Sequence, residues 1–173
     1  LGVLDTDGEP LSGMRIPLPD DLTGPERIAA MAHEVVDECT AAAPADRAKL
    51  PLVLCCPEAG AFGPESADFP ARLLAEVIAK SVVPIDAAHS RVIARGRAGV
   101  IEALGAALAL LKDGAATRCL VGGVDCLVDD GRAQTLADDE RLLTQSNKDG
   151  FVAGEAGAML LLSNRPEPGS LAA

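Results

Sequence analysis

The stretch RGRAGVIEALGAALALLK, residues 95–112, constrains the fold more than any other part of the sequence. Glu102 is the only acidic residue in it, and no charged residue lies between Glu102 and Lys112, so the pattern predicts a helix that is apolar on nearly every side. A helix of this kind belongs inside a protein rather than on its surface. Its first residues, 95–99, hold two glycines and predict a tight turn, where many α/β enzymes present a nucleophile. No nucleophile is present there.

Short apolar runs on both sides of this helix predict buried strands at residues 50–58, 117–128 and 150–163, and residues 81–95 predict one or two extended pieces. Residues 23–44 and 71–80 are apolar at helical spacing and predict two amphipathic helices. Turn residues between two extended runs predict a hairpin at residues 1–18, and a short helical piece is expected near residues 135–143. This order predicts an α/β domain with a layered α-β-α arrangement and a mixed sheet.

Composition limits the classes of function. The 173 residues suit one domain, and with 49% apolar but only 2% aromatic residues the core must be aliphatic. The net charge of −11 argues against a nucleic-acid groove and against an anionic membrane surface. The five cysteines show no C-x-x-C spacing and no pairing with histidine at zinc spacing, so no metal site and no cofactor are expected. Reduced cysteines and the absence of a long apolar run or signal peptide predict a cytoplasmic protein.

Two glycine-rich motifs occur in the last third of the chain. The first is VGGVD at residues 121–125, and the second is DGFVAGEAG at residues 149–157. Together with the preceding helix they resemble the N-terminal half of β-ketoacyl synthases, which have the thiolase-like fold. The residues that carry the resemblance are Gly114, Gly122, Gly123, Asp125, Asp149, Gly150, Phe151, Val152, Gly154, Glu155, Ala156 and Gly157. Ala156 stands where the family commonly has glycine.

The resemblance implies a thiolase-like half-domain over residues 1–165, with a mixed five-stranded sheet and a buried central helix, followed by a tail at residues 166–173. It also implies that the family's first strand, expected in the centre of the sheet, and the C-terminal half with its catalytic histidines are absent. In the family, a nucleophilic cysteine begins the buried helix. Counting back from the matched glycines places Arg97 at that position, and a guanidinium stays protonated and cannot accept an acyl group. We therefore expect a non-catalytic protein, a pseudoenzyme of fatty acid or polyketide synthesis.

Other interpretations remain open from the sequence. The segment IDAAHS, residues 85–90, superficially resembles the family's nucleophile motif and would place His89 at the cysteine position. The chain could instead be an active acyltransferase of the 3-oxoacyl-ACP synthase type, completed by a C-terminal half outside these residues. A plain α/β interaction module is the third interpretation.

The turn at residues 95–99 is also a candidate anion site. Arg95 and Arg97, beside the backbone N–H groups of Gly96 and Gly99, could hold a phosphate or a carboxylate. The simpler alternative is that these arginines pair with nearby acids such as Asp86 or Glu102.

The resemblance implies partners as well. Acyl-CoA or an acyl-carrier protein is the expected ligand. A homodimer, or a heterodimer with a related subunit, is expected through the strand at residues 91–95. An accessory role in a secretion system is a further possibility that the family allows.

Overall fold

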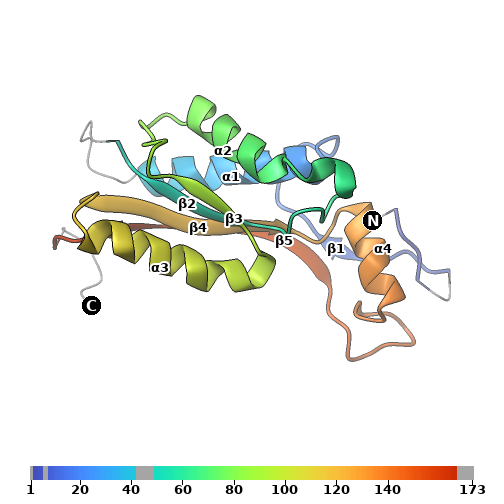
Figure 1. Cartoon of the computed structure of the whole chain (residues 1–173). Coiled ribbons are helices and arrows are strands. Elements are labelled where there is room, and N and C mark those ends of the chain that lie inside the picture. The colour runs from blue at the N-terminus through green and yellow to red at the C-terminus, as the bar shows by residue number, and fades with distance from the viewer. Residues whose placement is uncertain (1, 6–7, 42–48, 167–173) are drawn as a thin grey trace.

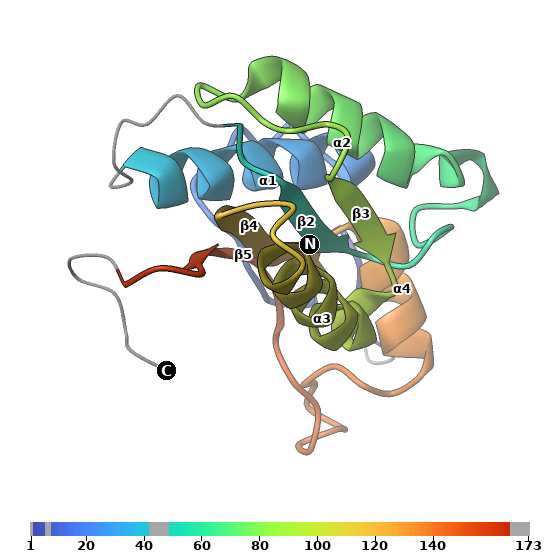
Figure 2. The same ribbon diagram turned by 60° about the vertical axis from the view of Figure 1, so that its left-hand side comes forward.

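The computed structural model describes residues 2–5, 8–41 and 49–166, and these residues form one sheet with helices on both faces. The sheet has five strands in the order β1-β5-β4-β2-β3. Figure 1 shows α1 and α2 above the sheet and α3 below it, and Figure 2 shows the same layers with α3 seen nearly end-on. The expected α/β layering with a mixed five-stranded sheet is therefore confirmed.

The mixed character of the sheet comes from one antiparallel pair of neighbouring strands. Strands β2 (Leu52–Cys56), β3 (Arg91–Ala94) and β4 (Arg118–Cys126) run parallel to one another, with β2 between the other two. The long strand β5 (Ala153–Ser163) runs antiparallel to β4 along the whole of β4, from Arg118 opposite Ser163 to Cys126 opposite Glu155. The parallel strands are connected through helices, as the alternation of apolar runs and helical patterns predicts.

Two helices cover the first face of the sheet. Helix α1 (Gly24–Ala41) packs on β4 and β5, and α2 (Phe69–Lys80) packs on β3 and against α1. Their buried stripes are aliphatic, apart from Phe69 and the buried Arg27, and they meet the side chains of β2 that point to this face. Both helices lie where the sequence predicted them, within two residues at their starts.

The opposite face is covered by α3 (Gly99–Lys112), which a single 3₁₀ turn, η2 (Gly96–Ala98), precedes. Helix α3 packs on β2, β3 and β4 through Ala103, Ala107 and Leu111. Its outer face is not buried: Ile101 is 76% exposed and Leu108 is 57% exposed. The expectation of a helix buried on all sides therefore holds only for the side that faces the sheet.

The N-terminal segment differs from the expected hairpin of residues 1–18. A short antiparallel bridge joins Leu4 to Pro10, but the later run does not pair with the first one. Instead, β1 (Gly13–Met14) lies parallel to the start of β5 at the edge of the sheet. The gap expected in the centre of the sheet is also not there, because β4 pairs directly with both β2 and β5.

Two smaller elements complete the fold. Helix α4 (Asp130–Asp138) begins earlier than the helical piece expected near residues 135–143, because the Asp129 carboxylate caps it by accepting a hydrogen bond from the Arg132 N–H. The expected tail falls outside the described residues except for residue 166. None of the described helices combines the length and the hydropathy needed to cross a membrane.

Candidate functional site

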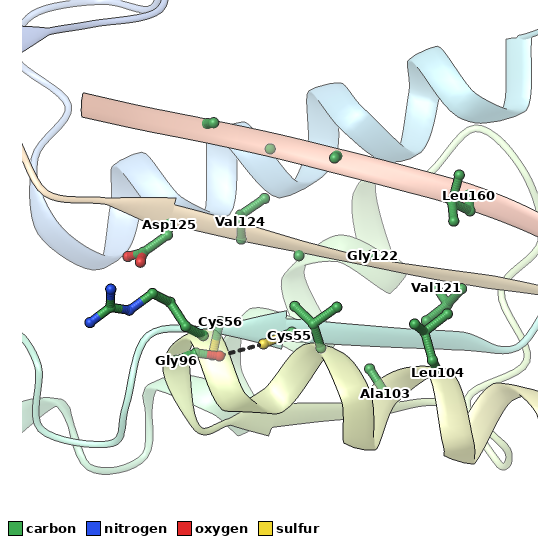
Figure 3. Close-up of a pocket in the computed structure, with 16 residues that line it drawn as sticks. Cys55, Cys56, Gly96, Ala103, Leu104, Val121, Gly122, Val124, Asp125 and Leu160 are labelled. Atoms are coloured by element: carbon green, nitrogen blue, oxygen red, sulfur yellow. Dashed lines mark hydrogen bonds between the residues drawn. The ribbon is translucent and has the colours of Figure 1, made fainter.

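A cavity of about 340 Å³ lies between α3 and the sheet, next to the turn at residues 95–99. Its walls are almost entirely apolar. Figure 3 shows Leu104 of α3, Val121 of β4 and Leu160 of β5 along one part of it, with Cys55 and Gly96 further along. Of the described residues, Arg97 and Asp125 are the only ones that bring a charged side chain to the lining. The volume is at the lower end of the range for small-molecule sites.

The turn that begins α3 brings a cysteine close to the helix start. Gly96 adopts φ 52°, a conformation that favours glycine, and the carbonyl oxygen of Gly96 accepts a hydrogen bond from the Cys55 thiol over 3.1 Å (Figure 3). A Cβ at Gly99 would lie 2.6 Å from Cys55 Sγ, so only glycine fits at that position. A thiol from β2 therefore lies against the first turn of the helix, although no cysteine is present in that turn itself.

The Cys55 thiol is held in its protonated form. The side chain is 4% exposed, and burial raises the pKa of Cys55 above its ordinary value. The negative charges of Asp125, Glu58 and Glu102 raise this pKa further. Because the thiolate is the nucleophile, a thiol with a raised pKa is a poor acyl acceptor.

The two arginines of the turn have different environments. Arg95 forms an ion pair with Glu102, Nε to Oε2 at 3.5 Å, and both side chains are largely exposed. Arg97 lines the cavity, and the structure gives it no hydrogen-bond or ion-pair partner among the described residues. The alternative of pairing with a local acid therefore applies to Arg95, and Arg97 remains the candidate for binding an anion.

Asp125, the other charged residue of the lining, is already engaged. Its Oδ1 accepts hydrogen bonds from Arg132 Nη1 and from the backbone N–H of Cys126. Arg132 in turn lies over the ring of Phe62, 5.6 Å from its centroid. The ion pair orients Asp125 and partly offsets its charge, so among the described residues Arg97 is the charged side chain of the lining without a partner.

Several motif glycines are explained by close packing at or beside the cavity. A Cβ at Gly122 would overlap the backbone of Ala158 and Met159 on β5, and a Cβ at Gly123 would crowd Cys55. A Cβ at Gly157 would lie 2.6 Å from Val35 of α1. These glycines allow β4, β5 and α1 to approach one another, which is a packing role.

The remaining motif residues lie away from the cavity. Asp149, Gly150 and Phe151 belong to the loop before β5, where Phe151 stacks under the guanidinium of Arg141 at 5.7 Å. Gly154 accepts a backbone hydrogen bond from Leu127 at the start of β5. The Glu155 side chain is fully buried in an ion pair with Arg27, which joins β5 to α1.

His89 is not at the start of α3. It lies on the turn before β3, where Nδ1 is 2.7 Å from Asp86 Oδ2 and the side chain is 43% exposed. The next residue, Ser90, is structural: its hydroxyl donates to the Asp86 carbonyl and accepts a hydrogen bond from the Leu52 N–H at the start of β2. This geometry does not support the interpretation of IDAAHS as a nucleophile motif.

We expect Ser90→Ala to lower the free energy of unfolding by about 1–3 kcal/mol, because it leaves the buried N–H of Leu52 without an acceptor. Urea unfolding followed by far-ultraviolet circular dichroism measures this difference. Ser146→Ala is the matched control, since among the described residues the side chain of Ser146 forms a hydrogen bond only with Thr144, on an exposed loop. Equal stability of the two variants would contradict the structural role of Ser90.

Among residues 2–5, 8–41 and 49–166, no group of three or more His, Cys, Asp or Glu side chains could hold a metal ion. Of the four predicted turn residues, Gly96 and Arg97 line the cavity, and Arg95 and Gly99 do not. The motif residues that line it are Gly122, Gly123, Asp125, Ala156 and Gly157. Sequence reasoning missed Cys55, Cys56, Val100, Leu104, Val121 and Leu160 as lining residues. A usable signal existed for the cysteines: they end a buried parallel strand, and the carboxyl ends of such strands meet the starts of the following helices.

Comparisons with known proteins find similarity to solved structures. No family model matches the chain, and no curated protein matches it. The chain is similar to a solved structure of a 3-oxoacyl-(acyl-carrier-protein) synthase III, with a TM-score of 0.48 and 17% sequence identity over 91% of this chain. The chain spans 41% of the length of that protein.

Proposed function

We propose that this chain is a non-catalytic relative of the β-ketoacyl synthases that binds the acyl chain of a thioester. The observation that carries the proposal is the start of α3: it has an apolar cavity and a free arginine, but no nucleophile. The nearest thiol, on Cys55, is buried, donates to a carbonyl oxygen and has a raised pKa. Such a site favours binding without covalent chemistry.

The cavity suits a ligand with an apolar chain and an anionic head. Leu104, Val121 and Leu160 would contact the chain, and Arg97 would contact a phosphate or carboxylate outside it. Acyl-CoA and acyl-carrier protein both present this combination through the phosphate of pantetheine. All described cysteines are free thiols, which supports the proposal of a reducing, cytoplasmic setting.

Isothermal titration with octanoyl-CoA, and with free CoA as the reference, tests this proposal. We expect octanoyl-CoA to bind at least about tenfold more tightly than CoA, because the cavity buries the chain. Ala158→Phe fills the cavity from β5 and should weaken octanoyl-CoA binding at least about tenfold. Ala75→Phe, on the exposed side of α2, is the matched control and should bind as the unmodified chain does.

Two further measurements separate the alternatives. Arg97→Gln should weaken octanoyl-CoA but leave octanoyl-N-acetylcysteamine, which lacks phosphates, unchanged. Intact-mass spectrometry after incubation should find no acyl adduct. An adduct on Cys55 would instead support an active acyltransferase, and no binding of either thioester would support a plain interaction module.

A further inference from the structure

A histidine and an aspartate of α1 meet the end of α2 on the first face of the sheet. Nε2 of His33 lies 3.5 Å from Oδ2 of Asp37, four residues later on the same helix. The same nitrogen lies 3.0 Å from the carbonyl oxygen of Lys80, the last residue of α2. Residues four apart lie on the same side of a helix. One nitrogen and two oxygens therefore come together between the two helices.

Two buried polar atoms of this region have no partner. Among the described residues, neither Oδ1 of Asp37 nor the hydroxyl oxygen of Ser81 has a hydrogen-bond partner, although both atoms are buried. The first belongs to the carboxylate that faces His33, and the second belongs to the residue that follows Lys80. Folded proteins rarely leave buried polar atoms unpaired, so this pair indicates a bound group between the helices.

The charges of this region favour a cation. The C-terminal end of a helix carries a partial negative charge, and α2 ends at Lys80. Asp37 adds a carboxylate, and within the described part of the chain its only ion-pair contact is with His33. The ammonium group of Lys80 pairs instead with Glu76, one turn earlier on α2. A carboxylate and a helix end therefore lie together without a lysine or arginine to balance them.

The spacing of the three atoms around His33 fits a tetrahedral metal ion. Zinc binds imidazole nitrogen and carboxylate oxygen at about 2.0–2.2 Å, so two ligand atoms of a tetrahedral zinc are about 3.3–3.5 Å apart. The 3.5 Å between His33 and Asp37 matches this spacing, and the 3.0 Å to the Lys80 carbonyl oxygen is slightly shorter. Imidazole suits zinc, copper and nickel, whereas magnesium and calcium prefer oxygen ligands alone.

We propose that His33 Nε2, the Asp37 carboxylate and the Lys80 carbonyl oxygen bind a divalent cation of the zinc class, which joins α1 to the end of α2. The metal replaces the hydrogen bond between the ring and the carbonyl, so the ring carries its proton on Nδ1. A water or the Ser81 hydroxyl completes the four ligands. The side chains of His33 and Asp37 are 29% and 31% exposed, so the ion enters from solvent.

This site is separate from the cavity of the proposed function. Helices α1 and α2 lie on one face of the sheet, and α3 with the cavity lies on the other (Figure 1). The site uses two metal-binding side chains and a backbone carbonyl, so it differs from a group of three such side chains and from the cysteine spacings that a sequence reveals. The inference therefore goes beyond thioester binding and does not depend on it.

Isothermal titration of the metal-free, reduced chain with zinc chloride tests the proposal. We expect one zinc ion to bind per chain. His33→Gln and Asp37→Asn keep the size of the side chains and should each weaken zinc binding at least about tenfold. His89→Gln is the matched control and should bind zinc as the unmodified chain does, because His89 also lies beside an aspartate, Asp86, but on an exposed turn.

The imidazole nitrogen resonances in an NMR spectrum locate the metal without any variant, because the chain has only two histidines. Zinc should shift the resonances of His33 and leave those of His89 in place. With Co²⁺ in place of zinc, we expect the visible absorption of a tetrahedral site and no thiolate charge-transfer band.

Three results would each overturn the proposal. The first is that the chain binds no zinc, which leaves the contact of His33 with Lys80 as a simple hydrogen bond. The second is a zinc affinity that neither His33→Gln nor Asp37→Asn changes. The third is a metal located elsewhere, shown by a shift of the His89 resonances in place of those of His33 or by a thiolate band with Co²⁺.

Discussion

Replacing Arg27 with methionine is expected to lower the free energy of unfolding by about 3–5 kcal/mol, because it leaves the buried Glu155 carboxylate without its counter-ion. The side chains of Arg27 and Glu155 are 1% and 0% exposed, and Nε of Arg27 lies 2.6 Å from Oε2 of Glu155. The same guanidinium donates to the carbonyl oxygens of Ile16, Pro19 and Leu22. Arg27 therefore ties the N-terminal segment and α1 to β5.

Electrostatics gives this prediction a pH dependence. Burial alone would raise the pKa of Glu155, but hydrogen bonds from Arg27, Cys126 and the Ile16 N–H outweigh it and lower this pKa below its ordinary value. A carboxyl with a lowered pKa stabilises the fold above its unfolded pKa, near 4.3, and this contribution is lost as the pH falls. The difference between Arg27→Met and the unmodified chain should therefore be largest near neutral pH and shrink in acid.

Urea unfolding followed by circular dichroism measures the effect, since the chain has no Trp or Tyr for fluorescence. The double variant Arg27→Met with Glu155→Met is the control. Replacing a whole buried ion pair by apolar residues of similar volume is often close to neutral, so most of the lost stability should return. If the free energy of unfolding of the single variant falls by less than about 1 kcal/mol, the ion pair does not stabilise the fold as its geometry indicates.

The same ion pair shows where sequence reasoning stops. Glu155 stands out in the sequence because it lies in a glycine-rich motif, and the structure buries its side chain in an ion pair with Arg27. Arg27 lies 128 residues earlier, on an amphipathic helix, and nothing in its neighbourhood indicates a buried partner. Periodicity indicates which face of a helix is apolar. It does not indicate which distant side chain will contact a charged residue, such as Arg27, that lies on that face.

The elements were predictable and their pairing was less so. Apolar runs located β2, β4 and β5, and helical spacing located α1, α2 and α3. The N-terminal runs both have the pattern of strands, but that pattern does not name the partner, and the second run pairs with β5 instead of the first. The order of the strands depends on long-range packing, which local patterns do not encode.

The candidate site was predictable in part for a related reason. The glycines of β4 belong to a recognisable motif, and Arg97 was located by counting back from them. The structure brings Arg97 and these glycines to one cavity. Cys55 is 44 residues before Gly99 in the chain and reaches it because β2 runs parallel beside β3, the strand that leads into the turn. The sequence also does not show that the outer face of α3 is exposed. An apolar pattern on all sides of a helix does not indicate whether the chain itself covers the face that points away from the sheet.

Raising the pH is expected to unfold this chain in the alkaline range, through its buried thiols. Burial raises the pKa of Cys56 to about 12 and those of Cys119 and Cys126 to about 11, from an ordinary value of 9.0. A thiol with a raised pKa in the folded state stabilises the fold below pH 9, and the unfolded chain releases its protons first as the pH rises. Stability should therefore fall between about pH 9 and pH 11.

The size of this loss is comparable to the stability of a typical domain. Each thiol contributes up to about 1.4 kcal/mol per pH unit, and less near each pKa, so three thiols lower the free energy of unfolding by roughly 6 kcal/mol over these two units. Typical domains have about 5–15 kcal/mol in total. Urea unfolding at a series of pH values under reducing conditions measures the slope, and thiolate absorbance reports ionisation directly because the chain has no tyrosine.

Cys119→Ala separates the thiols from other groups that titrate in alkali. Cys119 is fully buried and its Sγ donates only a long hydrogen bond, 3.5 Å, to the Leu120 carbonyl, so the variant removes one titrating group with little other change. It should reduce the slope by about 1.4 kcal/mol per pH unit. Removal of the buried sulfur atom also lowers the free energy of unfolding, but by the same amount at every pH, so it does not change the slope. An unchanged slope would assign the alkaline unfolding to lysines and ion pairs. A free energy of unfolding that stays flat from pH 9 to pH 11 would mean that the thiols are accessible to water in the folded state.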